Sequence, residues 1–216
     1  MLRRCGDLRA SVPGREDRVD TTSAAGDTIL VVCQANETRS PLYAAALAAA
    51  LARRGAPWIV GSAGTLAAEA RPARADVRRV AFDLGLYLDH HRSRRLTAEL
   101  ATAAGLIVTA ERAHRDHVAQ LVPDVAARTF TAGELAELLE RAWGGRGRGS
   151  PAEVAAVAHD ARPRWPAAGE DLADPTGRGA DAHRELGVAV RRLVEPVADA
   201  LGGPDPGTGR RSPSTG

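Results

Sequence analysis

Short runs of β-branched and other apolar residues alternate with longer helical patterns along most of this chain. Four such runs predict strands, at 28–32, 58–65, 106–109 and 127–130. Strands that alternate with helices form parallel β-α-β units, because a parallel pair needs a long crossover connection. The pattern therefore predicts an α/β fold, a doubly wound parallel sheet with helices on both faces.

Helical patterns fill the intervals between and after these strands. They cover residues 40–55, 75–85, 97–105, 111–122, 131–143, 152–161 and 180–201. The first, SPLYAAALAAALARRG, is expected to start with Ser40 as its N-cap and Pro41 in its first turn, and to stop at Gly55.

One domain is expected, because 216 residues fall near the usual size of a single domain. We place it at residues 27–202. Segments 1–26 and 203–216 are rich in Arg, Gly, Ser and Asp or Pro and poor in large apolar groups, so both are predicted to be disordered tails. Nothing in the apolar pattern requires a partner chain, so a monomer is expected.

The composition argues against several classes of protein. The chain has 29 basic and 27 acidic residues, so no excess of charge points to a nucleic acid or an anionic membrane. No signal peptide and no apolar run of membrane-spanning length is found, which predicts a cytoplasmic protein without membrane insertion. The two cysteines, Cys5 and Cys33, have no neighbours at metal-ligand spacing, so neither a metal nor another cofactor is expected.

The stretch ILVVCQANETRSP, residues 29–41, carries the chemistry. Cys33 ends the first predicted strand shortly before a helix begins, and ligands of such sheets bind beyond the carboxyl ends of the strands. Backbone N–H groups of the loop and the helix dipole favour a bound anion and a thiolate alike. Arg39 offers a planar fork for two phosphate oxygens. The loop therefore predicts a thiolate aimed at the phosphorus of a bound anion.

The Cys-x5-Arg spacing alone is weak evidence, because 29 of the 216 residues are arginine. A partly buried cysteine in an ordinary βα loop explains it equally well. The strand before the loop, the Ser-Pro after it and Asn36, which can bond the loop backbone, favour the functional interpretation.

The same stretch resembles the signature loop of the low-molecular-weight protein tyrosine phosphatases. Five further segments resemble that family in the expected order: GSAGT (61–65), HRSRRLT (91–97), LIVTAERAHRDHV (106–118), RTFTAGEL (128–135) and DLADPTGRG (171–179). The run DPTGRGADAHRELG looks most like bacterial members linked to exopolysaccharide kinases. The fold expected is then flavodoxin-like, with four strands in the order 2-1-3-4.

The resemblance implies a role for each residue of the loop. Cys33 would attack phosphorus and form a phosphocysteine, while Arg39 and the loop stabilise the phosphoryl oxygens. The phosphate-binding residues would be Gln34, Ala35, Asn36, Glu37, Thr38 and Arg39. Ser40 would stabilise the departing thiolate, and Asn36, Ser62 and His91 would hold the loop in shape.

Asp174 matches the general acid, which would protonate the leaving oxygen and later activate water. An idle Asp-Pro turn is the alternative, and Asp205-Pro206 shows that the dipeptide recurs. The position of Asp174 before the last helix favours catalysis.

Four positions depart from the family pattern. Ala35 replaces a glycine, which is tolerable if its φ is negative. Thr38 replaces a cysteine that protects the nucleophile as a disulfide in many members, so Cys33 would be easier to over-oxidise. Glu37 puts a carboxylate at the rim of an anion site, and Thr176 and LAAEA (66–70) replace aromatic residues of the cleft walls.

The leading hypothesis is a phosphatase for phosphotyrosine in proteins, with a bacterial tyrosine kinase that controls polysaccharide export as a candidate partner. Phosphoarginine hydrolysis is one alternative, because a carboxylate at Glu37 can pair with a guanidinium. Arsenate reduction is another, although only Cys5 is available as a second thiol. The non-enzymatic alternative is a phosphopeptide-binding module, which the presence of nucleophile, arginine and acid argues against.

Overall fold

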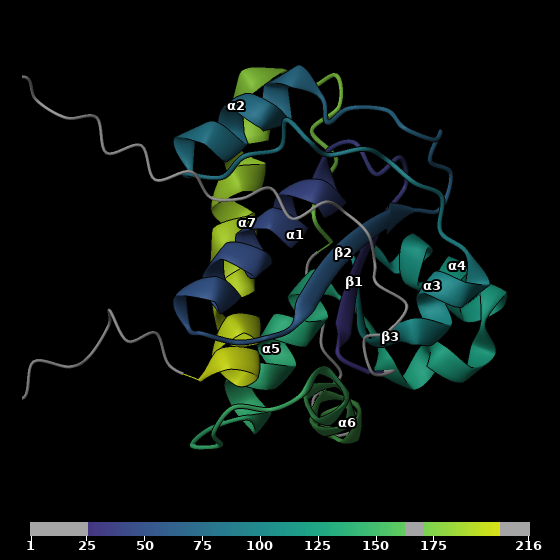
Figure 1. Cartoon of the computed structure of the whole chain (residues 1–216), viewed down its shortest axis with the longest axis vertical. Coiled ribbons are helices and arrows are strands. Elements are labelled where there is room, and N and C mark those ends of the chain that lie inside the picture. The colour runs from purple at the N-terminus through teal and green to yellow at the C-terminus, as the bar shows by residue number, and fades with distance from the viewer. Residues whose placement is uncertain (1–25, 163–170, 204–216) are drawn as a thin grey trace, which may run out of the picture.

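The structure is a computed structural model that describes residues 26–162 and 171–203 (Figure 1). The tails predicted at 1–26 and 203–216 lie outside the described residues except for Gly26 and Gly203. The domain boundaries at 27 and 202 therefore stay a prediction.

Four parallel strands form one sheet in the order β2-β1-β3-β4. They are β1 (Thr28–Cys33), β2 (Ile59–Gly64), β3 (Ala104–Thr109) and β4 (Thr129–Thr131). The predicted fold class and strand order are confirmed. Because β1 lies between β2 and β3 and all three strands run parallel, the loops that follow them meet at the carboxyl end of the sheet.

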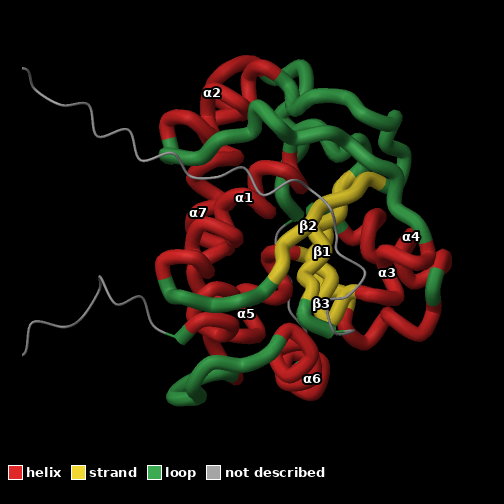
Figure 2. Tube along the Cα trace, viewed as in Figure 1, coloured by secondary structure: helices red, strands yellow, loops and turns green. Residues whose placement is uncertain are grey.

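Helices cover both faces of this sheet. They are α1 (Arg39–Arg53), α2 (Ala75–Asp83), α3 (Ala98–Ala103), α4 (Arg112–Leu121), α5 (Ala132–Ala142), α6 (Pro151–Ala161) and α7 (Gly179–Gly202), with a 3-10 helix, η1, at Pro123–Arg128. Figures 1 and 2 show α1, α5 and α7 on one side of the strands and α3 and α4 on the other.

The alternation of side chains along β1 explains this layering, because successive residues of a strand point to opposite faces. Ile29 and Val31 belong to the large core that packs with α1, α5 and α7. Leu30 and Val32 belong to the smaller core beneath α3 and α4. The central strand is thus buried on both faces, as its unbroken apolar sequence predicts.

Most boundaries differ from the prediction by one or two residues, and two of these differences have a clear physical reason. The N-cap expected at Ser40 is wrong, because α1 already begins at Arg39 and Thr38 occupies the cap position. The hydroxyl of Ser40 is engaged with the loop instead. The fourth strand starts at Thr129 rather than residue 127, because Pro123, a residue favoured at a helix start, begins η1 just before it.

Arg54 ties the end of α1 to the last helix. Its side chain is 1% exposed and donates to Glu195 Oε2 (2.8 Å) and Asp199 Oδ1 (2.6 Å) of α7, and to Gly203 O (3.0 Å). Burial lowers the pKa of Arg54, but the hydrogen bonds and negative charges of Asp199 and Glu195 outweigh burial, so the pKa is raised. The guanidinium therefore stays charged and fixes α7 against α1.

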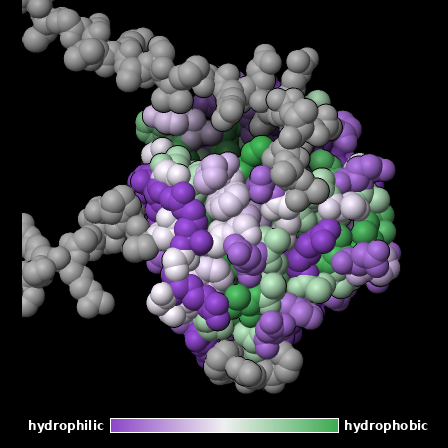
Figure 3. All heavy atoms as spheres, turned by 60° about the horizontal axis from the view of Figure 1, so that its bottom comes forward, coloured by the Kyte–Doolittle hydropathy of each residue, from purple (hydrophilic) through white to green (hydrophobic). Residues whose placement is uncertain are grey.

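The surface is mixed in character. On the face turned forward in Figure 3, hydrophobic residues form small groups between hydrophilic ones. Among the described residues, no helix combines the length and the apolar character needed to cross a bilayer.

Candidate active site

The loop from Cys33 to Thr38 joins the carboxyl end of β1 to the start of α1. Two backbone bonds fasten it to the segment after β2: Thr65 N donates to Cys33 O and Leu66 N donates to Gln34 O, both at 2.9 Å. Gly64 permits this approach, because a Cβ there would lie 2.5 Å from Gln34 O and 2.8 Å from Asn36 N. The loop is thus clamped against the end of β2.

The thiol of Cys33 is buried and has two polar neighbours. Its Sγ lies 3.0 Å from Ser40 Oγ, and Asn36 N donates to it at 3.3 Å. Ser40 Oγ also accepts from Asn36 Nδ2 at 2.9 Å, and its own hydrogen is within reach of two acceptors, the sulfur and Ala63 O at 3.4 Å. Hydrogen bonds directed at Sγ stabilise a thiolate. The role of Ser40 toward the departing thiolate stays a prediction.

Asn36 holds the loop in shape. Its φ is +56°, a left-handed conformation that asparagine tolerates better than most residues. Its Nδ2 donates to Ser62 Oγ (2.9 Å) as well as to Ser40, and its Oδ1 accepts from Arg94 N (3.0 Å). His91 Nε2 donates to the backbone O of Asn36 at 2.7 Å. The three residues predicted as a support network, Asn36, Ser62 and His91, are therefore in contact.

The other loop residues expected to bind phosphate line the same turn. Gln34 and Ala35 are exposed, Glu37 is half-buried and Thr38 is buried. Among described non-glycine residues, positive φ occurs at Asn36 and Ala70 alone, so Ala35 meets the condition for replacing glycine. Leu66 lies beside the loop and is 58% exposed. It belongs to the segment 66–70, which replaces aromatic residues of the cleft wall.

Arg39 lies between two carboxylates. The side chain is only 3% exposed, and it donates through Nη2 to Asp174 Oδ2 at 2.8 Å and through Nη1 to Glu111 Oε1. Nη1 also donates to Leu172 O at 3.1 Å. The guanidinium therefore joins the loop after β1, the loop after β3 and the segment before α7.

Asp174, the predicted general acid, is thus at the site although it lies 141 residues after Cys33 in the chain. Its side chain is 41% exposed, and its Oδ1 accepts from Thr176 N at 3.0 Å. Burial raises the pKa of Asp174, but the hydrogen bonds from Thr176 and the charge of Arg39 outweigh burial, so the pKa is lowered. A dianion bound to Arg39 would compete with Asp174 for the guanidinium and favour the protonated carboxyl.

His114 lies close enough to Arg39, Glu111 and Asp174 to interact with their charges. It is 5% exposed, and its Nδ1 is buried without a hydrogen-bond partner in the described part of the chain. Burial lowers the pKa of His114 more than the charges of Glu111, Asp171 and Asp174 raise it, and Arg39 lowers it further. The imidazole is therefore held neutral near pH 7.

Sequence reasoning assigned no role to Glu111, Arg94 or His114. Glu111 had a readable signal, because it follows β3 by two residues and the carboxyl ends of β1 and β3 meet at the same edge. Arg94 had none, since its contact with Asn36 Oδ1 is made by its backbone N–H and its side chain donates from Nε to a backbone oxygen, Ser62 O, at 2.8 Å. Within residues 26–162 and 171–203, no group of three or more His, Cys, Asp or Glu is placed to hold a metal ion.

Comparison with known proteins agrees with this geometry. Residues 28–142 match the family described as low molecular weight phosphotyrosine protein phosphatase. The chain is 36% identical over 115 residues to the low molecular weight protein-tyrosine-phosphatase Etp of Escherichia coli K12, covering 53% of this chain and 74% of that protein.

Solved structures of two phosphatases share the fold of this chain. The tyrosine phosphatase AmsI of Erwinia amylovora is 25% identical with a TM-score of 0.62, over 83% of this chain and 96% of that one. The YwlE arginine phosphatase of Geobacillus stearothermophilus is 25% identical with a TM-score of 0.60, over 80% and 90%. Asp174 lies beyond the segment matched by the family, so its place rests on the geometry above. The chain belongs to the low molecular weight phosphotyrosine protein phosphatase family, which confirms the family and the class of enzyme predicted from its sequence.

Proposed function

We propose that this protein hydrolyses phosphotyrosine in proteins through a phosphocysteine intermediate formed on Cys33. The observation that carries the proposal is that two groups of one loop meet a third group from a distant part of the chain. The thiol of Cys33 ends β1, Arg39 closes the loop, and the carboxyl of Asp174 is 2.8 Å from the guanidinium. Nucleophile, anion clamp and acid then surround one position for a phosphoryl group.

In the first step the thiolate attacks phosphorus. The S–P bond forms, the P–O bond to tyrosine breaks, and the leaving oxygen takes a proton from Asp174. Arg39 and the loop N–H groups stabilise the charge on the three remaining oxygens.

In the second step Asp174 removes a proton from water, whose oxygen attacks phosphorus. The S–P bond breaks, and the departing thiolate accepts hydrogen bonds from Ser40 and from Asn36 N.

The first test is hydrolysis of para-nitrophenyl phosphate without added metal. Wild type should turn over, Cys33→Ser should be inactive, and Asp174→Ala should lose roughly 10²–10⁴-fold in kcat, the usual contribution of a general acid. Arg39→Lys should also be impaired, because an ammonium cannot hold two phosphate oxygens in a fork. An inactive wild type that still binds phosphate would instead support a binding module.

We propose a bacterial tyrosine kinase as the substrate, because the run DPTGRGADAHRELG resembles family members linked to exopolysaccharide kinases. Etp of Escherichia coli, AmsI of Erwinia amylovora and EpsP of Ralstonia are bacterial low molecular weight phosphatases. They support a bacterial phosphotyrosine phosphatase, and the role in regulating polysaccharide export rests on the resemblance of that run. Loss of phosphotyrosine from the autophosphorylated kinase of the same organism, measured by immunoblot, would test this.

Phosphoarginine is a second candidate, because Glu37 puts a carboxylate at the loop mouth. Its side chain is half-buried, and its backbone O accepts from Arg74 N at 3.0 Å. A carboxylate at that rim opposes a plain dianion and favours one that bears a guanidinium. Wild type should then prefer phosphoarginine over phosphotyrosine, and Glu37→Gln should reverse the preference. An unchanged ratio of kcat/KM values would exclude this candidate.

A further inference from the structure

Two aromatic side chains stand in solvent at the end of α2. Phe82 is 68% exposed and Tyr87 is 75% exposed, and their rings pack edge to face with centroids 6.4 Å apart. The whole chain has three Trp, two Tyr and two Phe, so this pair is a large part of its aromatic content. Exposed aromatic rings that are already fixed in place make strong contacts in protein interfaces.

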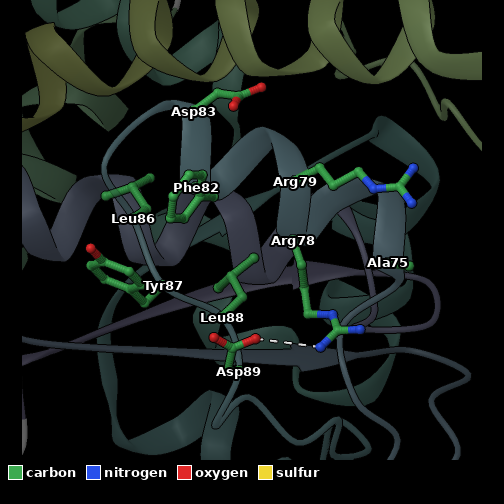
Figure 4. Close-up of a pocket in the computed structure, with 9 residues that line it drawn as sticks. All are labelled: Ala75, Arg78, Arg79, Phe82, Asp83, Leu86, Tyr87, Leu88 and Asp89. Atoms are coloured by element: carbon green, nitrogen blue, oxygen red, sulfur yellow. Dashed lines mark hydrogen bonds and ion pairs between the residues drawn. The ribbon is translucent and has the colours of Figure 1, made fainter.

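A pocket of about 470 Å³ lies beside the rings. Figure 4 shows Phe82, Leu86 and Tyr87 gathered at one end of the pocket and Arg78 and Arg79 at the other, with Leu88 between them. A volume of this size accommodates several amino-acid side chains. One end of the pocket is therefore apolar and the other is cationic.

The pocket is connected to the phosphate loop through the start of α2. Arg74, the residue before α2, donates its backbone N–H to Glu37 O at 3.0 Å. Phe82 follows Arg74 by eight residues, which is a rise of roughly 12 Å along a helix. The same distance is spanned by about four residues of an extended peptide. A polypeptide whose phosphorylated side chain enters the loop can thus reach the rings.

The charge at the start of α2 suits an anionic partner. Arg74, Arg78 and Arg79 are all exposed, against one acidic residue, Asp76, over the same stretch. Arg79 lies 3.7 Å from Asp76.

Arg78 lies 3.3 Å from Asp89, and in both pairs all four side chains are exposed. Such surface pairs contribute little to stability, so carboxylates of a partner can replace the acidic members. Asp83 lies at the margin of the pocket beside Phe82, and Asp89 lies beside Arg78, so the positive charge is concentrated at the start of α2.

We propose that the surface formed by Arg74, Arg78, Arg79, Phe82 and Tyr87, here called the α2 docking surface, binds the polypeptide that flanks the phosphorylated residue of the substrate. Acidic side chains of that polypeptide lie along the arginines, and an apolar side chain about four residues from the phosphorylated residue contacts the two rings. The proposal rests on the phosphatase function proposed above. It adds a class of substrate, a protein segment that is acidic near the phosphorylated residue and apolar beyond it.

The experiment compares a small substrate with two phosphotyrosyl peptides. Para-nitrophenyl phosphate is small enough to contact the phosphate loop without touching the α2 docking surface. One peptide carries Glu next to phosphotyrosine and Leu four residues away on both sides, and the other carries Ser at all those positions. The variants are Phe82→Ser/Tyr87→Ser and Arg78→Ala/Arg79→Ala. Leu121→Ser is the matched control, because Leu121 is 41% exposed at the end of α4 on the other side of the sheet.

Wild type should prefer the Glu/Leu peptide over the Ser peptide by about tenfold in kcat/KM. Both double variants should lose most of that preference, while kcat/KM for para-nitrophenyl phosphate stays within twofold of wild type. Leu121→Ser should behave as wild type on all three substrates. Equal preference in wild type and the Phe82→Ser/Tyr87→Ser variant would overturn the docking surface.

Two further outcomes, an inactive wild type and a dimer, are distinguished from a failure of the docking surface. An inactive wild type on para-nitrophenyl phosphate contradicts the proposed function, and docking is then read from fluorescence anisotropy of the labelled peptides with the Cys33→Ser variant. Equal binding of both peptides there would overturn the docking surface independently. Dimers of wild type that the Phe82→Ser/Tyr87→Ser variant cannot form, seen by size-exclusion chromatography, would assign the surface to a second copy and overturn the proposal too.

Discussion

Arg39 has two carboxylate partners whose tasks must differ. Asp174 has to give up its bond to the guanidinium, because a general acid needs its proton and a bound phosphoryl group occupies the same donors. Glu111 is under no such demand, since it approaches Nη1 from the loop after β3. Glu111 is therefore the partner that can keep the guanidinium in place through both steps.

We predict that Glu111→Gln raises the KM for para-nitrophenyl phosphate by about fivefold, with a smaller change in kcat. A neutral amide keeps a hydrogen bond but loses the charge-assisted part, worth about 1 kcal/mol. Steady-state kinetics at fixed pH measures this. Glu137→Gln is the matched control, because Glu137 has the same 30% exposure and pairs with Arg141 on α5. Unchanged KM in Glu111→Gln would mean that the pair does not orient Arg39.

At the scale of elements, the site depends on how closely β2 approaches the phosphate loop. We predict that Gly64→Ala lowers kcat/KM by at least about tenfold, because its Cβ would meet backbone atoms of Gln34 and Asn36 that cannot move without reshaping the loop. Gly61→Ala is the control on the same strand. Its Cβ would meet Nη2 of Arg94 at 2.7 Å, so that a side chain bonded through Nε to Ser62 O has to shift, but no backbone atom of the loop does. Equal losses in both variants, measured with para-nitrophenyl phosphate, would contradict the argument.

The elements themselves were largely predictable from sequence. Apolar strands such as β1 are visible because burial on both faces requires an unbroken apolar run. The Ser40 boundary was not, because a serine before Pro41 has the composition of an N-cap while its hydroxyl is engaged by Cys33 and Asn36. Local pattern cannot distinguish a capping hydroxyl from one used across the loop.

The site was predictable where residues share one loop and otherwise only by resemblance. Cys33 and Arg39 can be linked by spacing and strand position. Asp174 cannot be linked to them in this way, because its contact with Arg39 depends on how the segment before α7 returns to the carboxyl end of the sheet. The α2 docking surface is similarly hidden, since exposure of Phe82 and Tyr87 follows only from the way α2 packs.

For the whole molecule, buried His114 links stability to pH. Its pKa is lowered in the folded state, so the unfolded chain, with an ordinary pKa of about 6.5, binds the proton first. The contribution of His114 to the free energy of unfolding is fully present above about pH 6.5. It is lost as the pH falls toward the pKa of the folded state, by at most about 1.4 kcal/mol per pH unit.

We therefore predict that His114→Gln loses less free energy of unfolding between pH 7.5 and pH 5 than wild type does. Urea denaturation at both values measures the difference. His90→Gln, at an exposed position, should follow wild type. A variant at His114 with the wild-type pH dependence would show that other groups dominate acid unfolding.

The packing of α7 against α1 has a consequence for biosynthesis. All four strands are complete by residue 131, whereas α7 ends at residue 202. A ribosome that adds about 5–20 residues per second needs roughly 4–14 s to make the intervening stretch. During that interval the nascent chain displays the face of α1 that α7 later covers, and Arg54 has neither of its acidic partners. Chaperones that bind apolar helices should therefore find this chain late in translation, after its phosphate loop already exists.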